Sequence, residues 1–427
     1  MTIPVFEVPS RFWPDFLARF WNKGPGVLRR PFPNPPATMN EIFTGMRTLT
    51  RRLEKNDFRI PSRFFLEGKL VTGPAANIFH ARETDVDLAG YIRRLEKDVP
   101  GEYGFAITNF QALEPYIWAR FTGLLADLYK HLGFPLGRVL VDVFIGNYTR
   151  SFLGLHKDSQ DVITFVVSGR KKFLVWPYET FADVPGVQRN SQNRQVNIST
   201  HEYTSKIAKA TVLEGEPGDV LYWPRDYWHI AESDGGTAVT IALGFLPPQN
   251  PFQGIFNATE AMLDDQLLHI PETIPYQGSS SILLDQLLNL QDTLLKNADL
   301  QHTTRKFYLS WITRFGFDIA PDPLDEASLD DSDLIQACPH IPIIFLKEGE
   351  NLLCSVNGQN FFCAPHPNII AMFEEINKGI ALPVGKITEC YKGEAKAGTA
   401  TLKIDADGIK AMLLTLLRLR AIWKVSA

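Results

Sequence analysis

Hydrophobic positions divide the chain into a helical beginning, a strand-rich middle and a mainly helical end. Apolar side chains recur at helical spacing in 12–20 and 39–55, and again in 115–132, so an amphipathic helix is predicted at each. From about residue 105, short apolar runs bounded by turn residues dominate the pattern. The runs predicted to be β-strands are 139–144, 162–167, 172–176, 212–214, 220–223 and 238–245.

Closely spaced strands of this kind predict a β-sandwich or barrel, a group that includes the jelly rolls. Helical spacing returns after residue 248, and the segment 318–333 then contains seven acidic residues and no Lys or Arg, which predicts a solvated linker. A hairpin and two helices predicted beyond it indicate a small α/β domain. The predicted divisions are an N-terminal helical and strand segment that packs on the barrel (1–104), the barrel core (105–248), a helical region (249–317), an acidic linker (318–340) and a C-terminal domain (341–427).

The helical region contains a broad leucine stripe, which is wider than a short helix needs if it packs on one neighbour. Two copies of the stripe would bury each other, so a homodimer is predicted through helices between residues 255 and 315; packing within one chain is the alternative. The stripe consists of Leu283, Leu284, Leu287, Leu288 and Leu294.

Composition excludes several classes of protein. The 427 residues are 45% hydrophobic and carry a formal net charge of −5, which is typical of a globular protein and not of a disordered chain. Residues 341–427 hold ten basic and eight acidic side chains, too small a surplus to favour nucleic-acid binding. Four cysteines without a CxxC pair indicate a reducing cytosol, and no apolar run reaches the roughly 20 residues of a membrane span. A soluble cytoplasmic protein is therefore expected.

Two histidines and one aspartate form the most informative constellation. His156 and Asp158 are two residues apart, so on a strand their side chains project to the same side. His229 follows a strand-like run and a Pro-Arg-Asp turn. Two imidazoles and one carboxylate on one side of a cation leave three positions open, the arrangement found in non-haem Fe(II) oxygenases. On the motif alone, a chance His-x-Asp pair with merely hydrogen-bonded histidines remains the alternative.

A lysine is placed to complement such a metal site. Lys171 lies beyond the apolar run 162–167 and a short turn, at the start of the next strand. A cation there can pair with the distal carboxylate of a keto-diacid whose other end chelates the metal. The alternative is a surface lysine beside Arg170 and Lys172.

Two stretches carry a family resemblance: LHKDSQDVITFVVSGRKKFLVWP at 155–177 and GDVLYWPRDYWHIAES at 218–233. Both are similar to the JmjC-type, cupin-fold 2-oxoglutarate oxygenases. FLARFWNKGP at 16–25, followed by VLRR at 27–30, resembles the opening of the ribosomal-oxygenase branch. The regions after the barrel are similar to that branch only in pattern.

The resemblance implies an α+β protein with a double-stranded β-helix (jelly-roll, cupin) JmjC core, flanking helices, a helical dimerisation region and a C-terminal winged-helix-like domain. It implies a dioxygenase that uses Fe(II), 2-oxoglutarate and O2 to hydroxylate a peptide or protein side chain, with a ribosomal protein as one candidate. His156, Asp158 and His229 would be the catalytic iron ligands, and Lys171 would bind 2-oxoglutarate. The alternatives are a tailoring hydroxylase of an amino acid or peptide natural product, acting on a small molecule, and a non-catalytic cupin-like binding protein.

Three positions depart from the branch. Leu153 stands where a small or hydroxyl-bearing residue is frequent, and Phe144 and Asp142 stand where Tyr and Asn are frequent. These changes concern the substrate and not the iron ligands. Asp142 would favour a cationic substrate group if it faces the cavity, because an unpaired buried carboxylate is costly; pairing with a nearby Arg or Lys is the alternative.

A zinc cluster in the C-terminal part is a further, weaker hypothesis, because no CxxC knuckle is present and buried cysteines are the common alternative. Its candidate ligands are Cys338, His340, Cys354, Cys363, His366 and Cys390.

Overall fold

The computed structural model describes residues 6–184, 187, 203–233, 236–247, 298–397 and 400–426. The leucine stripe at 283–294 lies outside these residues, so the homodimer remains a prediction. Within the described residues, no helix is both long enough and apolar enough to cross a membrane.

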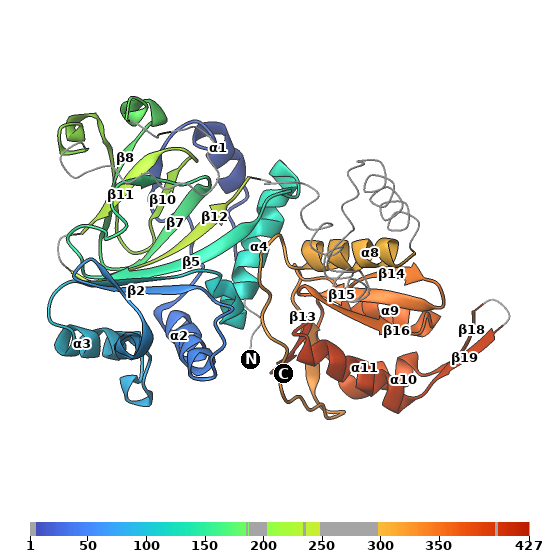
Figure 1. Cartoon of the computed structure of the whole chain (residues 1–427). Coiled ribbons are helices and arrows are strands. Elements are labelled where there is room, and N and C mark those ends of the chain that lie inside the picture. Colours follow the sequence, from blue (N-terminus) through green and yellow to red (C-terminus); the bar gives the residue numbers. More distant parts are fainter. Residues whose placement is uncertain are drawn as a thin grey trace, which may run out of the picture.

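The part of the chain up to residue 247 contains four described α-helices and twelve strands (Figure 1). The helices are α1 (Phe12–Arg19), α2 (Met39–Glu54), α3 (Leu88–Asp98) and α4 (Pro115–Leu132). The strands are β1 (Gly26–Leu28), β2 (Ser62–Leu66), β3 (Lys69–Val71), β4 (Tyr103–Ile107), β5 (Val139–Gly146), β6 (His156–Lys157), β7 (Asp161–Ser168), β8 (Lys171–Trp176), β9 (Thr211–Gly215), β10 (Val220–Trp223), β11 (Trp228–Glu232) and β12 (Ala238–Phe245).

These strands form two antiparallel sheets that make up the jelly-roll core. The larger sheet has the order β1-β10-β7-β12-β5-β4-β2-β3, and the smaller has the order β6-β11-β8-β9. The predicted jelly-roll core is thereby confirmed. Because β1 to β4 all join the larger sheet, segments from the first 107 residues complete the core instead of only packing on it.

Strands β5 and β12 lie side by side in the larger sheet, and each separates a hydrophobic core from the interior of the barrel. On β12, odd-numbered side chains such as Ile241 and Leu243 pack into the core, whereas Thr240 and Ala242 line the interior cavity. On β5, Val143 packs outward in the same way, because successive side chains of a strand point to opposite faces. This alternation fixes which residues can form a site.

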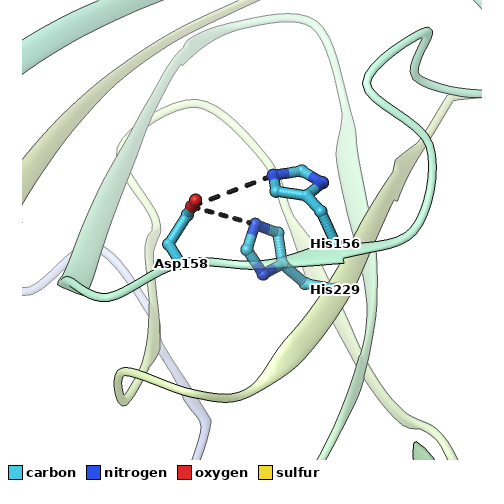
Figure 2. Close-up of side chains that lie close together, drawn as sticks. All are labelled: His156, Asp158 and His229. Atoms are coloured by element: carbon cyan, nitrogen blue, oxygen red, sulfur yellow. Dashed lines mark ion pairs between the residues drawn. The ribbon is translucent and has the colours of Figure 1, made fainter. Parts of the chain in front are cut away.

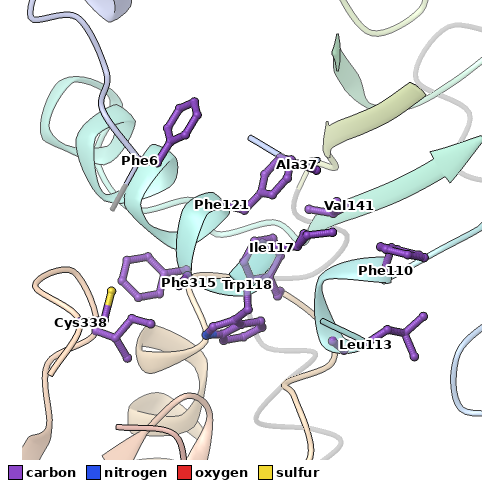
Figure 3. Close-up of a cluster of buried hydrophobic side chains, with 14 of the residues drawn as sticks. Phe6, Ala37, Phe110, Leu113, Ile117, Trp118, Phe121, Val141, Phe315 and Cys338 are labelled. Carbon is purple, nitrogen blue, oxygen red and sulfur yellow. The ribbon is translucent and has the colours of Figure 1, made fainter. Parts of the chain in front are cut away.

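Helix α4 covers the outer face of the larger sheet and lies between the barrel and the C-terminal part (Figure 1). It begins at Glu114, whose carboxylate accepts a hydrogen bond from the Ile117 amide, and ends at Gly133, whose φ of 76° favours glycine. Trp118 donates a hydrogen bond of 2.8 Å to Asn357 of the C-terminal part. Figure 3 shows side chains of both parts around this helix, in one continuous core.

The described C-terminal part consists of small sheets and helices. The predicted winged-helix-like character of this part remains a proposal. Its helices are α8 (Ala298–Thr313), α9 (Pro367–Ile376), α10 (Val384–Tyr391) and α11 (Ala406–Arg418), and its strands are β13 (Leu334–Ala337), β14 (Ile344–Glu348), β15 (Asn351–Val356), β16 (Gln359–Cys363), β17 (Leu382–Pro383), β18 (Gly393–Ala397), β19 (Ala400–Ile404) and β20 (Ile422–Val425).

The segment predicted to be a solvated acidic linker, 318–340, differs from that prediction. Two of its acidic residues form ion pairs with cations from the N-terminal part of the chain: Asp318 with Arg138, and Asp322 with both Arg52 and Arg59, whereas Asp325, Glu326 and Asp330 are exposed. The segment also contains β13, which pairs with β17 and β20. The local composition of the segment predicted solvent exposure, because the cations that pair with it lie elsewhere in the sequence.

Candidate metal centre

The side chains of His156, Asp158 and His229 converge on one point inside the barrel (Figure 2). His156 lies on β6 and is paired directly with His229 on β11, so the two imidazoles project from adjacent strands. The Nε2 atoms of His156 and His229 lie 3.8 and 3.5 Å from Asp158 Oδ2. One ligand atom of each residue lies within 4.8 Å of those of the other two, so a single ion can contact all three.

The backbone orients both imidazoles. Nδ1 of His156 lies 3.0 Å from the Gly154 carbonyl, and Nδ1 of His229 lies 3.2 Å from the Tyr227 carbonyl. A carbonyl only accepts, so each Nδ1 carries the proton and each Nε2 presents a lone pair to the centre. This arrangement is typical of histidines that bind a metal.

Burial and charge favour the ligand forms of two of these side chains. Burial lowers the pKa of His156 below its ordinary value, and the neighbouring His229 lowers it further, so the neutral imidazole is favoured. Burial raises the pKa of Asp158, but the two imidazoles and Arg63 outweigh this effect and hold the pKa below its ordinary value. Two imidazole nitrogens and a carboxylate oxygen form a donor set suited to a divalent transition metal.

The three side chains line a cavity of about 110 Å³ inside the barrel. Every residue that the sequence singled out for the site, or for the substrate, lies on its wall. The lining residues are Arg63, Asp142, Phe144, Tyr148, Ser151, Leu153, His156, Asp158, Gln160, Val162, Thr164, Lys171, Phe173, Trp223, His229, Ala231, Thr240, Ala242 and Gly244.

Lys171 is buried at the start of β8, so the surface-lysine alternative does not describe it. Its Nζ atom donates a hydrogen bond of 2.6 Å to the Tyr148 hydroxyl and lies 4.5 Å from the centre of that ring. Among the described residues, no carboxylate lies within 4.0 Å of this ammonium group. By contrast, the adjacent Arg170 and Lys172 extend outward and pair with Glu214 and Glu232.

Asp142 lies on the cavity side of β5, opposite the small residue Ala242 of β12. Within the described part of the chain it forms no ion pair with Arg or Lys at 4.0 Å or less, and its Oδ1 atom has no hydrogen-bond partner. Burial raises its pKa to about 7, although Thr108, the Asn109 backbone and Arg63 act in the opposite direction. Asp142 is therefore a cavity carboxylate without a counter-ion in the described chain.

The cavity residues that were not anticipated from the sequence include Tyr148, Arg63 and Trp223. Arg63 lies on β2, far from the ligand motifs in the chain, so only the strand order brings it to the site, whereas Tyr148 follows β5 and stands eight residues before His156. Trp223 stands in the quoted GDVLYWP stretch, and its ring packs 4.8 Å from that of His229 and 4.6 Å from that of Phe173. Its position in that motif was the one available signal.

Among the described residues, the proposed zinc ligands do not form a metal-binding group. In that part of the chain, one set of three donors is close enough for an ion, and it consists of His156, Asp158 and His229. Cys354 and Cys363 have sulfur atoms 3.6 Å apart and are buried, whereas Cys390 is exposed.

Comparison with known proteins agrees with the domain and the fold. Residues 67–245 match the family model of the cupin-like domain. Two structures of Escherichia coli YcfD, one of them titled as a ribosomal oxygenase, align with a TM-score of 0.51 and 18% identity over 99% of this chain and 100% of theirs. A structure titled as YcfD in complex with cobalt and 2-oxoglutarate aligns with a TM-score of 0.48 and 18% identity over 97% of this chain and 98% of that one. No curated protein sequence matches the chain.

Proposed function

We propose that this chain is an Fe(II)- and 2-oxoglutarate-dependent oxygenase. Its residues 67–245 match the cupin-like domain family, and its fold is like that of a ribosomal oxygenase. One observation carries the proposal: a His-Asp-His donor set and a buried lysine without a carboxylate partner in the described chain line the same cavity. The donor set suits the metal, and the lysine suits the far end of a dicarboxylate. Neither feature is needed to close a hydrophobic barrel.

Iron would be held by Nε2 of His156, Nε2 of His229 and a carboxylate oxygen of Asp158. Two imidazoles and one carboxylate on one side of the ion leave positions for a chelating cosubstrate and for O2. When bound, iron and 2-oxoglutarate supply the oxidising chemistry: O2 provides one oxygen atom to a C–H bond and one to succinate, and CO2 is released. The chain's own contribution is to bind and orient the reactants.

Lys171 would pair with the distal carboxylate of 2-oxoglutarate. Its ammonium group is already buried, so its desolvation occurs on folding and not on binding. The Tyr148 hydroxyl, 2.6 Å away, fixes its direction and offers a second hydrogen-bonding group to the same carboxylate. Both groups therefore position one end of the cosubstrate.

The aromatic residues of the wall would limit access of water. Phe173 and Trp223 pack against each other beside His229, and Phe144 extends the apolar surface from β5. A wall that combines apolar surface with directed polar groups is typical of cavities that bind small molecules. Water excluded from this region cannot compete for the reactive positions.

The substrate we propose is a peptide or protein side chain, with a ribosomal protein as the first candidate, because the solved structure of like fold is titled a ribosomal oxygenase. The second candidate substrate is an amino acid or peptide natural product, in which case the protein would be a tailoring hydroxylase. Asp142 favours it, because a cavity carboxylate without a counter-ion in the described chain suits a small donor-bearing substrate. Fold alone does not choose between them.

The oxygenase proposal is tested by anaerobic titration with Fe(II) and 2-oxoglutarate. The expected result is a visible metal-to-ligand charge-transfer band that is lost in His156→Ala. His131→Ala is the matched control, because His131 is exposed at the end of α4 and should leave the band unchanged. No band in the wild type, or an equal band in His156→Ala, would favour a non-catalytic cupin-like binding protein.

The substrate proposal is tested by intact-mass measurement of ribosomal proteins from a deletion strain. One protein should be lighter than in the parent strain by the mass of one oxygen atom, and re-expression of the wild type but not of His156→Ala should restore it. If every ribosomal protein kept its mass, the ribosomal version would be wrong and small amino-acid substrates would be screened next.

A further inference from the structure

Two chain segments supply the three proposed ligands, and two strand pairings join them: β6 with β11 through two residue pairs, and β7 with β10 through four. His156 lies on β6, a strand of two residues at the edge of the smaller sheet. Its described partner is β11, through the pairs His156 with His229 and Lys157 with Trp228. Asp158 lies just beyond this pairing. A two-residue edge strand provides few backbone hydrogen bonds to hold a metal site in register.

An ion pair joins the segments directly between the ligands. Lys157 Nζ donates a hydrogen bond of 2.7 Å to Asp226 Oδ1, and the two side chains are 2% and 12% exposed. Asp226 also donates its backbone N–H to the Asp158 carbonyl at 3.0 Å. Its φ of 62° lies in the left-handed region, where Asp and Asn are tolerated better than most residues. The turn before His229 is therefore attached to both Lys157 and Asp158.

A second ion pair crosses between the same segments in the opposite sense. Arg225 Nη2 and Nε donate to Asp161 Oδ2 at 2.6 and 3.0 Å, and the Arg225 backbone N–H donates to Asp161 Oδ1 at 3.1 Å. Asp161 is completely buried and also accepts from the Tyr222 hydroxyl at 3.4 Å. Each segment thus contributes one cation and one anion to the other.

We infer that these two pairs, Lys157–Asp226 and Asp161–Arg225, form a reciprocal clamp that positions His229 relative to His156 and Asp158. All four clamp residues are positioning residues, because they act on the metal only through the ligands. The inference rests on the proposed function, since it assumes that the three ligands bind a metal.

Physical arguments favour positioning over simple stabilisation. A buried ion pair loses much of its attraction to desolvation, and apolar residues of similar volume frequently stabilise a protein as well or better. What an apolar contact lacks is direction, whereas charge-assisted hydrogen bonds restrict distance and angle. Two such pairs of opposite sense oppose sliding of the segments in either direction. The clamp therefore fixes the stretch between the β6–β11 and β7–β10 pairings, where Asp158 and the turn before His229 lie.

The test measures binding of Co(II) alone, whose visible absorption reports on its ligands, to the apoprotein of full length. Lys157→Met should weaken Co(II) binding by about tenfold or more, in the range found for groups that orient metal ligands, whereas Lys157→Arg should retain most of the affinity. Arg94→Met is the matched control. Arg94 forms a buried ion pair with Asp85, with 2.7 Å between Nε and Oδ1, and neither residue lines the cavity. This substitution should lower the unfolding temperature without changing Co(II) affinity.

Each result decides the question. Equal Co(II) affinity in Lys157→Met and the wild type would overturn the clamp, whereas a wild type without Co(II) binding would contradict the proposed function itself. If Lys157→Met fails to fold, Asp226→Asn keeps the φ preference and removes the charge, and the same tenfold loss is expected. A loss of affinity in Arg94→Met as large as that in Lys157→Met would also overturn the clamp, because it would then reflect lower stability alone.

Discussion

The charges that frame the metal centre differ from the charges that face the cavity. Lys157 and Asp226 satisfy each other, as do Arg225 and Asp161. Lys171 and Asp142 line the cavity, and among the described residues neither of them has an opposite charge within 4.0 Å. Both sets lie within one barrel. Paired charges therefore mark the framework, and charges without a protein partner mark the place for a ligand.

The cost of burial explains this division. A buried charge without a partner loses its hydration and gains nothing in exchange, so proteins retain such a group where a ligand completes it. A charge with a partner in the protein recovers part of its lost hydration energy on folding, through the attraction of that partner. The two sets should consequently respond to mutation in opposite ways: framework variants should lose stability, and cavity variants should lose binding.

The largest effect is expected for the framework variant Asp161→Asn. Asp161 is completely buried and accepts three hydrogen bonds from Arg225, so although the Arg225 side chain is 35% exposed, removing the charge should cost about 3 to 5 kcal/mol. Urea unfolding at pH 7 measures the loss. Asp15→Asn is the control, because Asp15 pairs with Arg11 on the surface, where an ion pair contributes less than about 1 kcal/mol. Equal losses in the two variants would remove the distinction between buried and exposed pairs.

The opposite sign is expected for Asp142→Asn. Burial raises the pKa of Asp142 to about 7, against an ordinary value of 3.8, so between these pH values the folded state binds a proton that the unfolded state has released. The wild type therefore loses stability as the pH rises from about 4 to 7, by up to about 4 kcal/mol at about 1.4 kcal/mol per pH unit. Asp142→Asn cannot lose this proton and should be the more stable protein at pH 8.

Unfolding of both proteins at pH 4 and pH 8 checks the sign, with no difference expected at pH 4. Burial also raises the pKa of Glu114 to about 7, but Glu114 titrates in both proteins and cancels in the comparison. A less stable Asp142→Asn at pH 8 would show that the carboxylate has a favourable partner in the folded protein.

A smaller effect, confined to binding, is expected for Lys171→Ala. A charge-assisted hydrogen bond contributes about 1.5 to 3 kcal/mol, so 2-oxoglutarate binding should weaken by roughly 10- to 150-fold while metal binding and stability largely survive. Calorimetric titration of the metal-loaded protein measures the change. Lys172→Ala is the neighbouring control, because this side chain points outward to Glu232. An unchanged 2-oxoglutarate constant in Lys171→Ala would assign the role to another cation, such as Arg63.

Local pattern predicted the central elements of the fold well. The predicted runs at 220–223 and 238–245 coincide with β10 and β12, and the helix predicted at 115–132 coincides with α4. Strand β11 was missed because the Pro-Arg-Asp turn hides its start. The acidic segment was misjudged because the charges that neutralise it, such as Arg52 and Arg138, lie far away in sequence.

The candidate site divides in the same way. His156, Asp158 and Lys171 share one short stretch, and His229 lies in the second motif, so sequence spacing and family resemblance could bring them together. Arg63 could not be predicted, because its place depends on the order β5-β4-β2 in the larger sheet, and Tyr148 was missed because it stands outside the two motifs. Site residues within a motif can be predicted from a sequence, whereas site residues that are brought together by the order of strands in a sheet cannot.

The two-faced arrangement of β12 has a consequence for how this protein can acquire new substrates. Its cavity face consists of the small residues Thr240, Ala242 and Gly244, and its other face belongs to the core. Substitution on the cavity face changes the shape of the pocket while the packing beneath α4 is preserved. At Gly244 an added methyl group would lie 2.5 Å from the Gln160 side chain, so even alanine there would displace a lining residue. Diversification can therefore proceed along one side of a single strand, with the candidate metal ligands and the scaffold inherited intact.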